Sequence, residues 1–593
     1  MLFKEIIIFP ELFLGISIVY LVVHCTFLTK QKTHPLLQNS ILYLSVLSLF
    51  FSIYLVFNEP LNVLELSCLN NTVINDYSSF LSKLIIGTLA LFCLLMMQPY
   101  ILNQKITKFE YFLLILFGVL GLFLLCSSND LLTAYLSIEL QSLSFYVLAA
   151  FKKNSTFSVD AGIKYFILGA FASSMFLFGS SLLYGITGTV NFDDFHLLFV
   201  GDLLENNLEE EIEEFIASVE LYNIVVMTEF ELEDLLNTCG FSHSPFFDQN
   251  ILNLIGFNLS ELRLMNPNFV NFCESLYTFH LEVLDMEKEL LESLFMEDNL
   301  QVTEFSNNIN LIKFALVFIL IGLFFKITVA PFHIWAPDVY EGSPTSSTFF
   351  FSVVPKLAIF VLLLRIFYYS FFSLVESWRY FVVLVIIFSI IVGSFGGLEQ
   401  RKVKSLLVYS TISHMGYSLI SFSAGTFESL QMLISYLIIY SFSGLCVWSI
   451  FLVTRLKNNY FQKQNKDLTD LVLLGKSNYM LAVFFTTVLF SIAGFPPMIG
   501  FLVKMGIFLT AMESGMFFVA LITILCSVIG TFYYIRLIKI LYFEKVLVGK
   551  LYYPINFQSS VLITCLFFIL LFLFVNPTLL FLISHKFSLL LFF

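Results

Sequence analysis

The sequence predicts an all-α polytopic membrane protein with about fourteen transmembrane helices. Of its 593 residues, 58% are hydrophobic and only 12% are charged, and the mean hydropathy of +0.89 lies well above that of water-soluble chains. Apolar runs follow one another along the chain, each close to the roughly 20 residues that a helix needs to cross a hydrocarbon core about 30 Å thick. Basic residues also gather in alternate loops, as expected of a chain that crosses a membrane repeatedly.

The apolar runs define the expected helices in order. Their approximate limits are 10–29, 40–58, 82–101, 111–127, 131–151, 161–186, 311–330, 345–368, 380–396, 405–424, 428–454, 478–500, 514–541 and 558–583. The first run lacks the basic region and small-residue cleavage site of a signal peptide, so we expect it to remain as a helix. Because the number of runs is even, both termini are expected on the same side of the membrane.

The loops between these runs predict the orientation of the chain. Basic residues occupy alternate loops: Lys30 and Lys32, Lys105 and Lys108, Lys152 and Lys153, Arg401 with Lys402 and Lys404, Arg455 through Lys466, and Arg536 through Lys550. Basic loops stay on the side from which the chain inserts, so both termini are expected on the opposite side. The loop after the seventh run breaks the pattern, since it holds Asp338 and Glu341 with only His333 to offset them. We interpret these two acids as functional, not topological.

Residues 192–310 differ sharply in composition from the rest of the chain. Positions 201–310 hold 23 of the 43 acidic residues but only Arg263 and Lys288 as cations, a net charge of −21, whereas the remainder carries +8. No run in this segment is long enough to span a bilayer. We therefore expect an extramembrane insertion on the same side as the termini. A solvated acidic appendage is the simpler interpretation, and a docking module for a basic partner is the alternative.

The cysteines and loop motifs indicate that this chain carries no cofactor. The nine cysteines show no CxxC or iron–sulfur spacing, so no metal cluster is expected. Two of them, Cys239 and Cys273, lie in the insertion, where a disulfide is conceivable but not favoured. No GxGxxG or GxxxxGK[ST] motif is present, and neither a nucleotide nor a nucleic acid is expected as a ligand.

Two ionisable residues stand out in the fifth and sixth runs. Glu139 lies about eight residues or more from either end of its run, too deep to reach the headgroups. A charge at mid-bilayer costs about 2.5–3.5 kcal/mol even on the lenient insertion scale, so Glu139 needs a partner. Lys164 on the adjoining run is the expected partner. Because Lys164 lies near a helix end, it could alternatively extend to the interface.

Lys326 and Lys356 each accompany a proline. Pro331 follows Lys326 by five residues and removes a backbone donor within the seventh run, where the helix is expected to break. Lys356 directly follows Pro355, and we expect a second interruption there. Either lysine alone could be structural. Broken helices at bilayer depth are tolerated where they line protein or a wet cavity, and they commonly mark ion paths.

The twelfth run repeats the pattern of the seventh. Four residues interrupt it: Gly494, Pro496, Pro497 and Gly500. Lys504 lies just beyond. Two interrupted segments at comparable places in the two halves are typical of inverted repeats with a transport site between them. His414, in the tenth run, could simply be hydrogen-bonded, but a side chain with an ordinary pKa of about 6.5 suits a proton relay between lysines.

Together these segments resemble the proton-channel module of the antiporter-like subunits of respiratory complex I and of multisubunit cation/proton antiporters. The matching motifs are SIEL with Glu139, AGIKYFILGAFASS with Lys164, KITVAPFHIWAPDVYEGSPT with Lys326, Lys356 thirty residues further on, and AGFPPMIGFLVK ending at Lys504. The resemblance covers nearly the whole chain except the insertion. The lysine after the twelfth-run break, the N-terminal FPELFLG and the short segment Ser584 to Phe593 after the last run favour the subunit-2 type.

This resemblance implies a cofactor-free subunit of NADH:ubiquinone oxidoreductase in the mitochondrial inner membrane, with subunits 4L and 4 as neighbours. FMN, iron–sulfur clusters and ubiquinone would belong to other subunits. The termini and the insertion would face the intermembrane space, and membrane lipids and accessory proteins at the insertion would be further partners. A relay would couple NADH oxidation to proton pumping through Glu139, Lys164, Lys326, Lys356, His414 and Lys504. The alternatives are a subunit of a multisubunit sodium/proton antiporter and a non-conducting structural subunit.

On this basis the chain is expected to consist of six segments. They are an N-terminal three-helix segment (1–110), the first part of the first antiporter-like repeat (111–191), the acidic insertion (192–310), the second part of the first repeat with the seventh, broken helix (311–396), the second repeat with the twelfth, broken helix (397–557), and a C-terminal helix (558–593).

Overall fold

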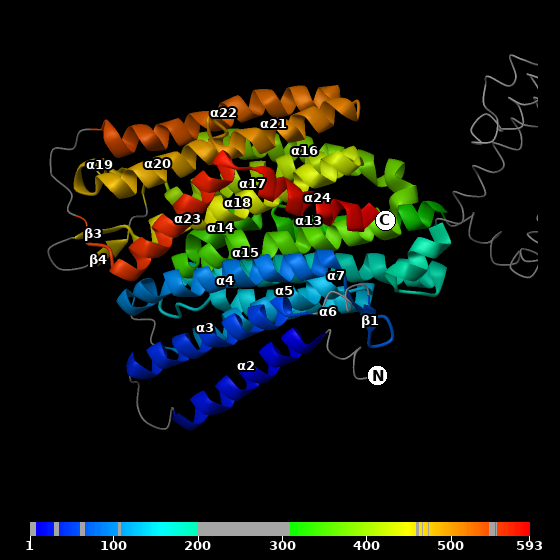
Figure 1. The fold of residues 1–593 in the computed structure, drawn as a ribbon, viewed down its shortest axis with the longest axis horizontal. Helices are drawn as coiled ribbons and strands as arrows, with labels where there is room; N and C mark the ends of the chain where they lie inside the picture. Colours follow the sequence, from blue (N-terminus) through cyan, green and yellow to red (C-terminus); the bar gives the residue numbers. More distant parts are fainter. Residues whose placement is uncertain are drawn as a thin grey trace, which may run out of the picture. The chain divides into compact units, whose positions relative to one another are not determined.

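The computed structural model describes residues 8–28, 35–59, 66–104, 108–199, 309–457, 462–464, 467–472, 474–544, 552 and 554–592. Contacts between Cα atoms divide the chain into one compact unit of residues 1–199 and 311–593 and a second of residues 200–310. Apart from the first two residues of one helix, every described residue belongs to the first unit. Within this unit, helices lie side by side from α2, at the bottom of the view, to α22 at the top (Figure 1).

The N-terminal half of the unit consists mainly of long helices. These helices are α2 (Phe9–Leu28), α3 (Pro35–Phe57), α4 (Tyr77–Asn103), α5 (Glu110–Ser127), α6 (Leu131–Ala149), α7 (Thr156–Thr187), α13 (Ile309–Ile327), the short α14 (Trp335–Gly342) and α15 (Thr345–Leu364). Strands β1 (Leu66–Cys68) and β2 (Val73–Asn75) form an antiparallel hairpin between α3 and α4. A π-helical turn, η4 (Arg365–Ser370), extends α15.

The C-terminal half follows the 3₁₀ turn η5 (Phe372–Leu374). Its helices are α16 (Val375–Leu398), α17 (Val403–Ala424), α18 (Phe427–Val453), α19 (Leu474–Ser477), α20 (Tyr479–Ala493), α21 (Ile499–Glu513), α22 (Phe517–Tyr542), α23 (Phe557–Val575) and α24 (Thr578–Phe592). The hairpin of β3 (Arg455–Lys457) and β4 (Gln462–Gln464) and the 3₁₀ turn η6 (Leu468–Leu471) lie between α18 and α19.

The predicted fold class is confirmed. Among the described residues, twelve helices are long and apolar enough to cross a membrane. The two remaining expected spans are α17, which is rich in serine, and α20 with α21, a broken pair of shorter helices. Both interruptions that the sequence predicts for the seventh and twelfth spans are present, since α13 ends at Ile327 and α20 ends at Ala493.

Two expectations about the helices are wrong. α15 continues through Pro355 without a break, because a buried helix surrounded by other helices can accommodate the lost N–H group. The last expected span, 558–583, is instead two helices, because Pro577 cannot continue the hydrogen-bond ladder of α23 and α24 begins after it. The short apolar helix α24 therefore follows α23.

The acidic insertion begins later than residue 192. Residues 192–199 are helical, and the side chains of Phe192 and Phe195 are buried in the first unit. The aromatic side chains explain why this stretch packs with the membrane helices. Cys239 and Cys273 lie outside the described residues.

The centre of the unit is α15, in which every residue from Thr345 to Leu364 is buried. It contacts α4, α5 and α6 on one side and α18 on another, and α18 in turn contacts α17, α20 and α21. Any polar side chain on α15 or on the inner faces of α17 and α18 must therefore find its partner within the protein.

Candidate functional site

The first break places Lys326 at the end of α13. The helix ends one residue later, Thr328 has a left-handed backbone (φ +70°), and the chain is irregular up to Trp335. The indole N–H of Trp335 donates to the carbonyl oxygen of Phe325 at 3.1 Å, which ties the start of α14 to the end of α13. Lys326 thus lies in the last turn of α13, directly before the break.

Lys326 faces α6. Its Nζ donates to the hydroxyl of Tyr146 at 3.3 Å, and the same ring lies 5.7 Å from Nζ, centroid to nitrogen. Glu139 lies two turns earlier on α6, hence on the same face as Tyr146, and close enough to act electrostatically on Lys326. Gly169 of α7 makes room for this arrangement, since a Cβ there would lie only 2.1 Å from the Tyr146 hydroxyl.

Lys164 has a different partner from the expected one. Among the described residues it forms no salt bridge with Glu139, and its Nζ lies 2.5 Å from Oδ2 of Asp338 on α14. Both side chains are more than half exposed. Lys164 is nine residues into α7, where α14 packs against the helix, and this proximity decides the pairing.

The acidic loop after the seventh span is neutralised by lysines from two different helices. Asp338 pairs with Lys164, and Glu341 pairs with Lys402, which precedes α17. Lys404 donates to the carbonyl oxygen of Ser343 at 2.7 Å. α14 is therefore attached by charge to α7 on one side and to α17 on the other.

Lys356 lies in the core of the unit. Its side chain, on α15, is only 2% exposed, and Nζ donates to the hydroxyl of Tyr440 on α18 at 2.9 Å. The ring of Tyr440 also lies 5.5 Å from the ring of His414, centroid to centroid. One tyrosine therefore contacts both groups.

His414 on α17 is 4% exposed and is held by two tyrosines. Its Nδ1 lies 2.5 Å from the hydroxyl oxygen of Tyr436, and its Nε2 lies 3.1 Å from that of Tyr534. The Tyr534 hydroxyl donates in turn to Ser410 Oγ at 2.6 Å. Both ring nitrogens have an oxygen partner, so the imidazole is fixed in orientation while a proton can be held at either nitrogen.

The second break holds the side chain of Lys504. This lysine of α21 is 8% exposed, and Nζ donates to the carbonyl oxygens of Ile492 at 2.9 Å and Ala493 at 3.0 Å. These carbonyls lie at the C-terminal end of α20, which carries partial negative charge. Gly494 ends α20 with a φ of +84°, and a Cβ there would lie 2.8 Å from Lys504 Cδ. Lys504 also lies 5.2 Å from the ring of Tyr417, which contacts His414.

The structure therefore connects three of the expected residues through aromatic side chains. Lys356, His414 and Lys504 are linked by Tyr440 and Tyr417. Lys326 and Glu139 form a separate group around Tyr146, and Lys164 lies apart with Asp338. Four prolines were expected at helix breaks: Pro331, Pro496 and Pro497 lie in irregular segments between helices, whereas Pro355 lies inside α15.

Sequence reasoning missed the tyrosines and one charged pair. Tyrosines inside apolar runs are too common in this chain to single out, and only the contacts with Lys326, Lys356 and His414 reveal them. Glu11 and Lys83 form a buried ion pair. Both residues lie near the start of an apolar run, where a charged side chain is usually taken to face the membrane surface. In the described part of the chain, no group of three or more histidine, cysteine, aspartate or glutamate residues could hold a metal ion.

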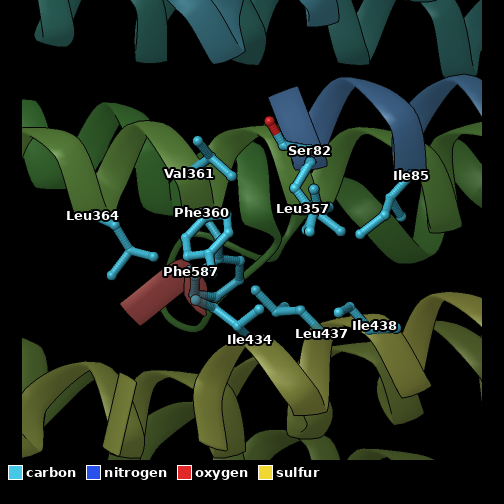
Figure 2. A pocket seen from close by; sticks show the side chains of 11 residues that line it. Ser82, Ile85, Leu357, Phe360, Val361, Leu364, Ile434, Leu437, Ile438 and Phe587 are labelled. Atoms are coloured by element: carbon cyan, nitrogen blue, oxygen red, sulfur yellow. The ribbon is translucent and has the colours of Figure 1, made fainter. Parts of the chain in front are cut away.

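An apolar cavity lies beside the helix of Lys356. Figure 2 shows it between α4, α15 and α18, with Phe587 of α24 pointing into it. Ser82 supplies the single polar side chain of its lining, and the other lining residues are apolar. The lining therefore offers few hydrogen-bond partners, whereas a buried water typically makes two to four hydrogen bonds.

Fold and site together define a multi-pass membrane protein in which two broken helices and a fully buried helix hold lysines against tyrosines and a histidine. The family described as "NADH:quinone oxidoreductase/Mrp antiporter, TM" matches residues 128–226 and 286–530. The chain belongs to this family.

Relatives similar in sequence extend over almost the whole chain. NADH-ubiquinone oxidoreductase chain 2 of Marchantia polymorpha is 34% identical over 98% of both chains, and that of Arabidopsis thaliana is 32% identical over 98% of this chain and 96% of the relative. NADH-quinone oxidoreductase subunit N of Pelagibacter ubique is 32% identical over 91% of this chain and 89% of the relative.

Solved structures share the fold at lower identity. A chain in respiratory complex I from Thermus thermophilus has a TM-score of 0.65 at 22% identity and covers 96% of this chain and 98% of its own. A chain in the Mrp complex from Dietzia sp. has a TM-score of 0.67 at 16% identity and covers 98% of this chain and 97% of its own.

Proposed function

We propose that this chain is the proton-translocating subunit 2 of a mitochondrial NADH:ubiquinone oxidoreductase. The observation that carries the proposal is the buried row of Lys356, His414 and Lys504, joined by tyrosines in the centre of the membrane unit. Ionisable groups in a membrane interior are costly and are retained where they handle charge. The relatives in Marchantia and Arabidopsis carry the name NADH-ubiquinone oxidoreductase chain 2, and this name supports NADH oxidation by ubiquinone as the reaction that drives pumping.

The charged groups would act in order along the unit. A change of charge in a neighbouring subunit acts on Glu139 and Lys164, and Glu139 controls how readily Lys326 keeps its proton. A lysine that is removed from water can exist in both protonation states, whereas an arginine would stay charged. Release of the proton from Lys326 then loads Lys356 on α15.

The second half of the relay has a shorter path. Tyr440 accepts a hydrogen bond from Lys356 and its ring lies against the ring of His414, so one side chain contacts both groups. His414 then passes the proton toward Lys504, which the carbonyls of α20 hold in place. Lys504 exchanges it with the exit side or with the next subunit.

The wider setting follows from the same assignment. The redox reaction belongs to the complex, and its FMN, iron–sulfur clusters and ubiquinone are bound by other subunits. In the inner membrane this chain lies between subunits 4L and 4, with both termini and residues 200–310 toward the intermembrane space. The positive-inside pattern supports that orientation, and the negative charge of residues 201–310 suits accessory proteins with basic surfaces.

The test is proton pumping by the purified assembly in vesicles, with NADH and ubiquinone, for the wild type and for Lys326→Ala. We expect the wild type to pump and the variant to lose most pumping while the complex still assembles. Lys313→Ala is the matched control, because Lys313 lies on the same helix but is exposed. An assembly that exchanges sodium for protons without any quinone reductase activity would instead identify an antiporter subunit. Unchanged pumping by Lys326→Ala would identify a structural subunit.

A further inference from the structure

A second group of charges lies buried among the first helices, far along the sequence from the relay. Glu11, in the first turn of α2, and Lys83, two turns into α4, form an ion pair with 2.5 Å between Oε1 and Nζ. The side chains are 3% and 0% exposed. Neither group has another hydrogen-bond partner among the described residues. A buried ion pair without supporting hydrogen bonds is less stable than apolar residues of similar size, so stability alone does not account for it.

Further acids surround Lys83. Glu59, which follows α3, is half-buried, interacts electrostatically with both Lys83 and Glu11, and accepts a hydrogen bond from Asn75 at 2.7 Å. Asp76, the N-cap residue of α4, lies two turns before Lys83 and hence on the same face of the helix. Glu11, Glu59, Asp76 and Lys83 are called the N-terminal charge cluster below. It holds three carboxyl groups and one lysine.

The N-terminal charge cluster is connected to the helix of Lys356. Arg365, at the end of α15, lies 2.7 Å from Oδ2 of Asp76. It also donates to the carbonyl oxygens of Cys126 at 3.0 Å and Ser128 at 2.8 Å, which fixes the end of α15 against α5. Nine residues separate Lys356 from Arg365, about 13 Å along the helix. Charges of alternating sign therefore run from Glu11 through Lys83 and Asp76 to α15.

The remaining charges near the cluster are also acidic. Asp193 acts electrostatically on Asp76, and the thiol of Cys126 on α5 lies within reach of both Lys83 and Arg365. Including Asp193, four carboxyl groups face two bases, so the group as a whole favours the uptake of protons. Burial raises the pKa of Glu59, and Glu11 adds to the effect while Lys83 and Asn75 oppose it. Burial likewise raises the pKa of Asp76 against the influence of Arg365.

We propose that the N-terminal charge cluster is a second proton-exchange site, coupled through Asp76 and Arg365 to the end of the Lys356 helix. Glu59 and Asp76 are the half-buried members of the cluster, and Asp76 is held by Arg365, so Glu59 is the member that exchanges a proton with the adjacent aqueous side. A proton can move from the Lys83 ammonium to a neighbouring carboxylate, leaving a neutral amine and a carboxylic acid with no change in total charge. Loading the cluster changes the charge that Asp76 and Arg365 experience, and hence the field at Lys356. This role rests on the proposed function in proton pumping.

The test compares the intact complex carrying Lys83→Met, Glu11→Gln, or both. Each single variant leaves one buried charge without its partner and is expected to reduce assembly. The double variant removes both charges and is expected to assemble at the wild-type level. If the pair is functional, the double variant still pumps several-fold fewer protons per NADH oxidised, with a changed pH profile. Glu110→Gln is the control, since Glu110 is an exposed acid on α5.

Two results would overturn the proposal. One is a double variant that pumps with the wild-type ratio and pH profile, which would make the pair purely structural. If the double variant does not assemble, Glu59→Gln decides, because that side chain is half-buried and its replacement is nearly isosteric. We expect Glu59→Gln to shift the pH profile of pumping, and an unchanged profile would refute the site. Failure of the wild type itself to pump would count against the proposed function and is distinguishable from both results.

Discussion

The hydroxyl of Tyr440 offers the sharpest test of the relay, because it is the hydrogen-bond partner that the structure gives to Lys356. Tyr440→Phe removes one oxygen and leaves the ring and its contact with His414 in place. A hydrogen bond to a charged group contributes about 1.5–3 kcal/mol, and the loss is not compensated where water has no access. Lys356 is only 2% exposed, so this range applies to it.

This loss destabilises the charged form of Lys356. At about 1.36 kcal/mol per factor of ten, the equilibrium between its charged and neutral forms changes by about 10- to 150-fold. The proton-loaded state then becomes scarce, and we expect pumping in vesicles to fall by at least tenfold while assembly is unaffected. Tyr380→Phe is the control, because Tyr380 is an exposed tyrosine on α16. Wild-type pumping by Tyr440→Phe, with Lys356→Met inactive, would show that the proton bypasses this hydroxyl and would refute the reasoning.

Three further outcomes are expected. Gly494→Ala should cost about 1–2 kcal/mol of stability, because the backbone at this position is left-handed, and the new Cβ should displace Lys504. We expect the melting temperature and pumping both to fall, and normal pumping would contradict the role of the second break. Burial, with the neighbouring acids Asp194 and Asp193, raises the pKa of Asp130 to about 6 in the folded protein. Because the folded state then binds this proton more tightly than the unfolded state, the thermal stability of the wild type should rise as the pH falls from about 6 to 4, and Asp130→Asn should abolish that rise. Asp338→Asn should leave assembly intact, since its ion pair is exposed, but change pumping if release of Lys164 matters; identical pumping ratios would reduce the pair to a surface contact.

The broken helices illustrate how far local sequence reaches. Pro331 ends α13 and Gly494 ends α20 for reasons contained in a few residues, namely a missing donor and a left-handed backbone. The same reasoning failed at Pro355, where the helix continues. The proline is equally unable to donate there, but the helices around α15 hold it straight. Local chemistry therefore predicts where a helix is weakened, and packing decides whether it ends.

The partners of the charges depended on the tertiary structure. Glu139 and Lys164 lie on adjoining helices, which made them the natural pair in the sequence, yet α14 brings Asp338 to Lys164. Likewise, nothing near Lys83 in the sequence points to Glu11, more than seventy residues earlier. Hydrogen bonds and ion pairs act over about 3–4 Å. The number of residues between two groups in the sequence says little about whether they approach so closely when they lie on different helices.

Hydropathy and composition were enough to predict a chain that crosses the membrane many times, the breaks after α13 and α20, and the lysines that remain in apolar surroundings, because the bilayer imposes hydrophobic length and excludes unpaired polar groups. The burial of α15, its continuation through Pro355, the tyrosines that join Lys356 to His414, and the ion pairs of Asp338 and Glu11 became visible in the packing of the helices alone. This is because apolar helices satisfy their own backbone hydrogen bonds and give similar hydropathy signals. Their mutual packing is set instead by side-chain shape and small residues, which the pattern of apolar residues along a single helix does not reveal.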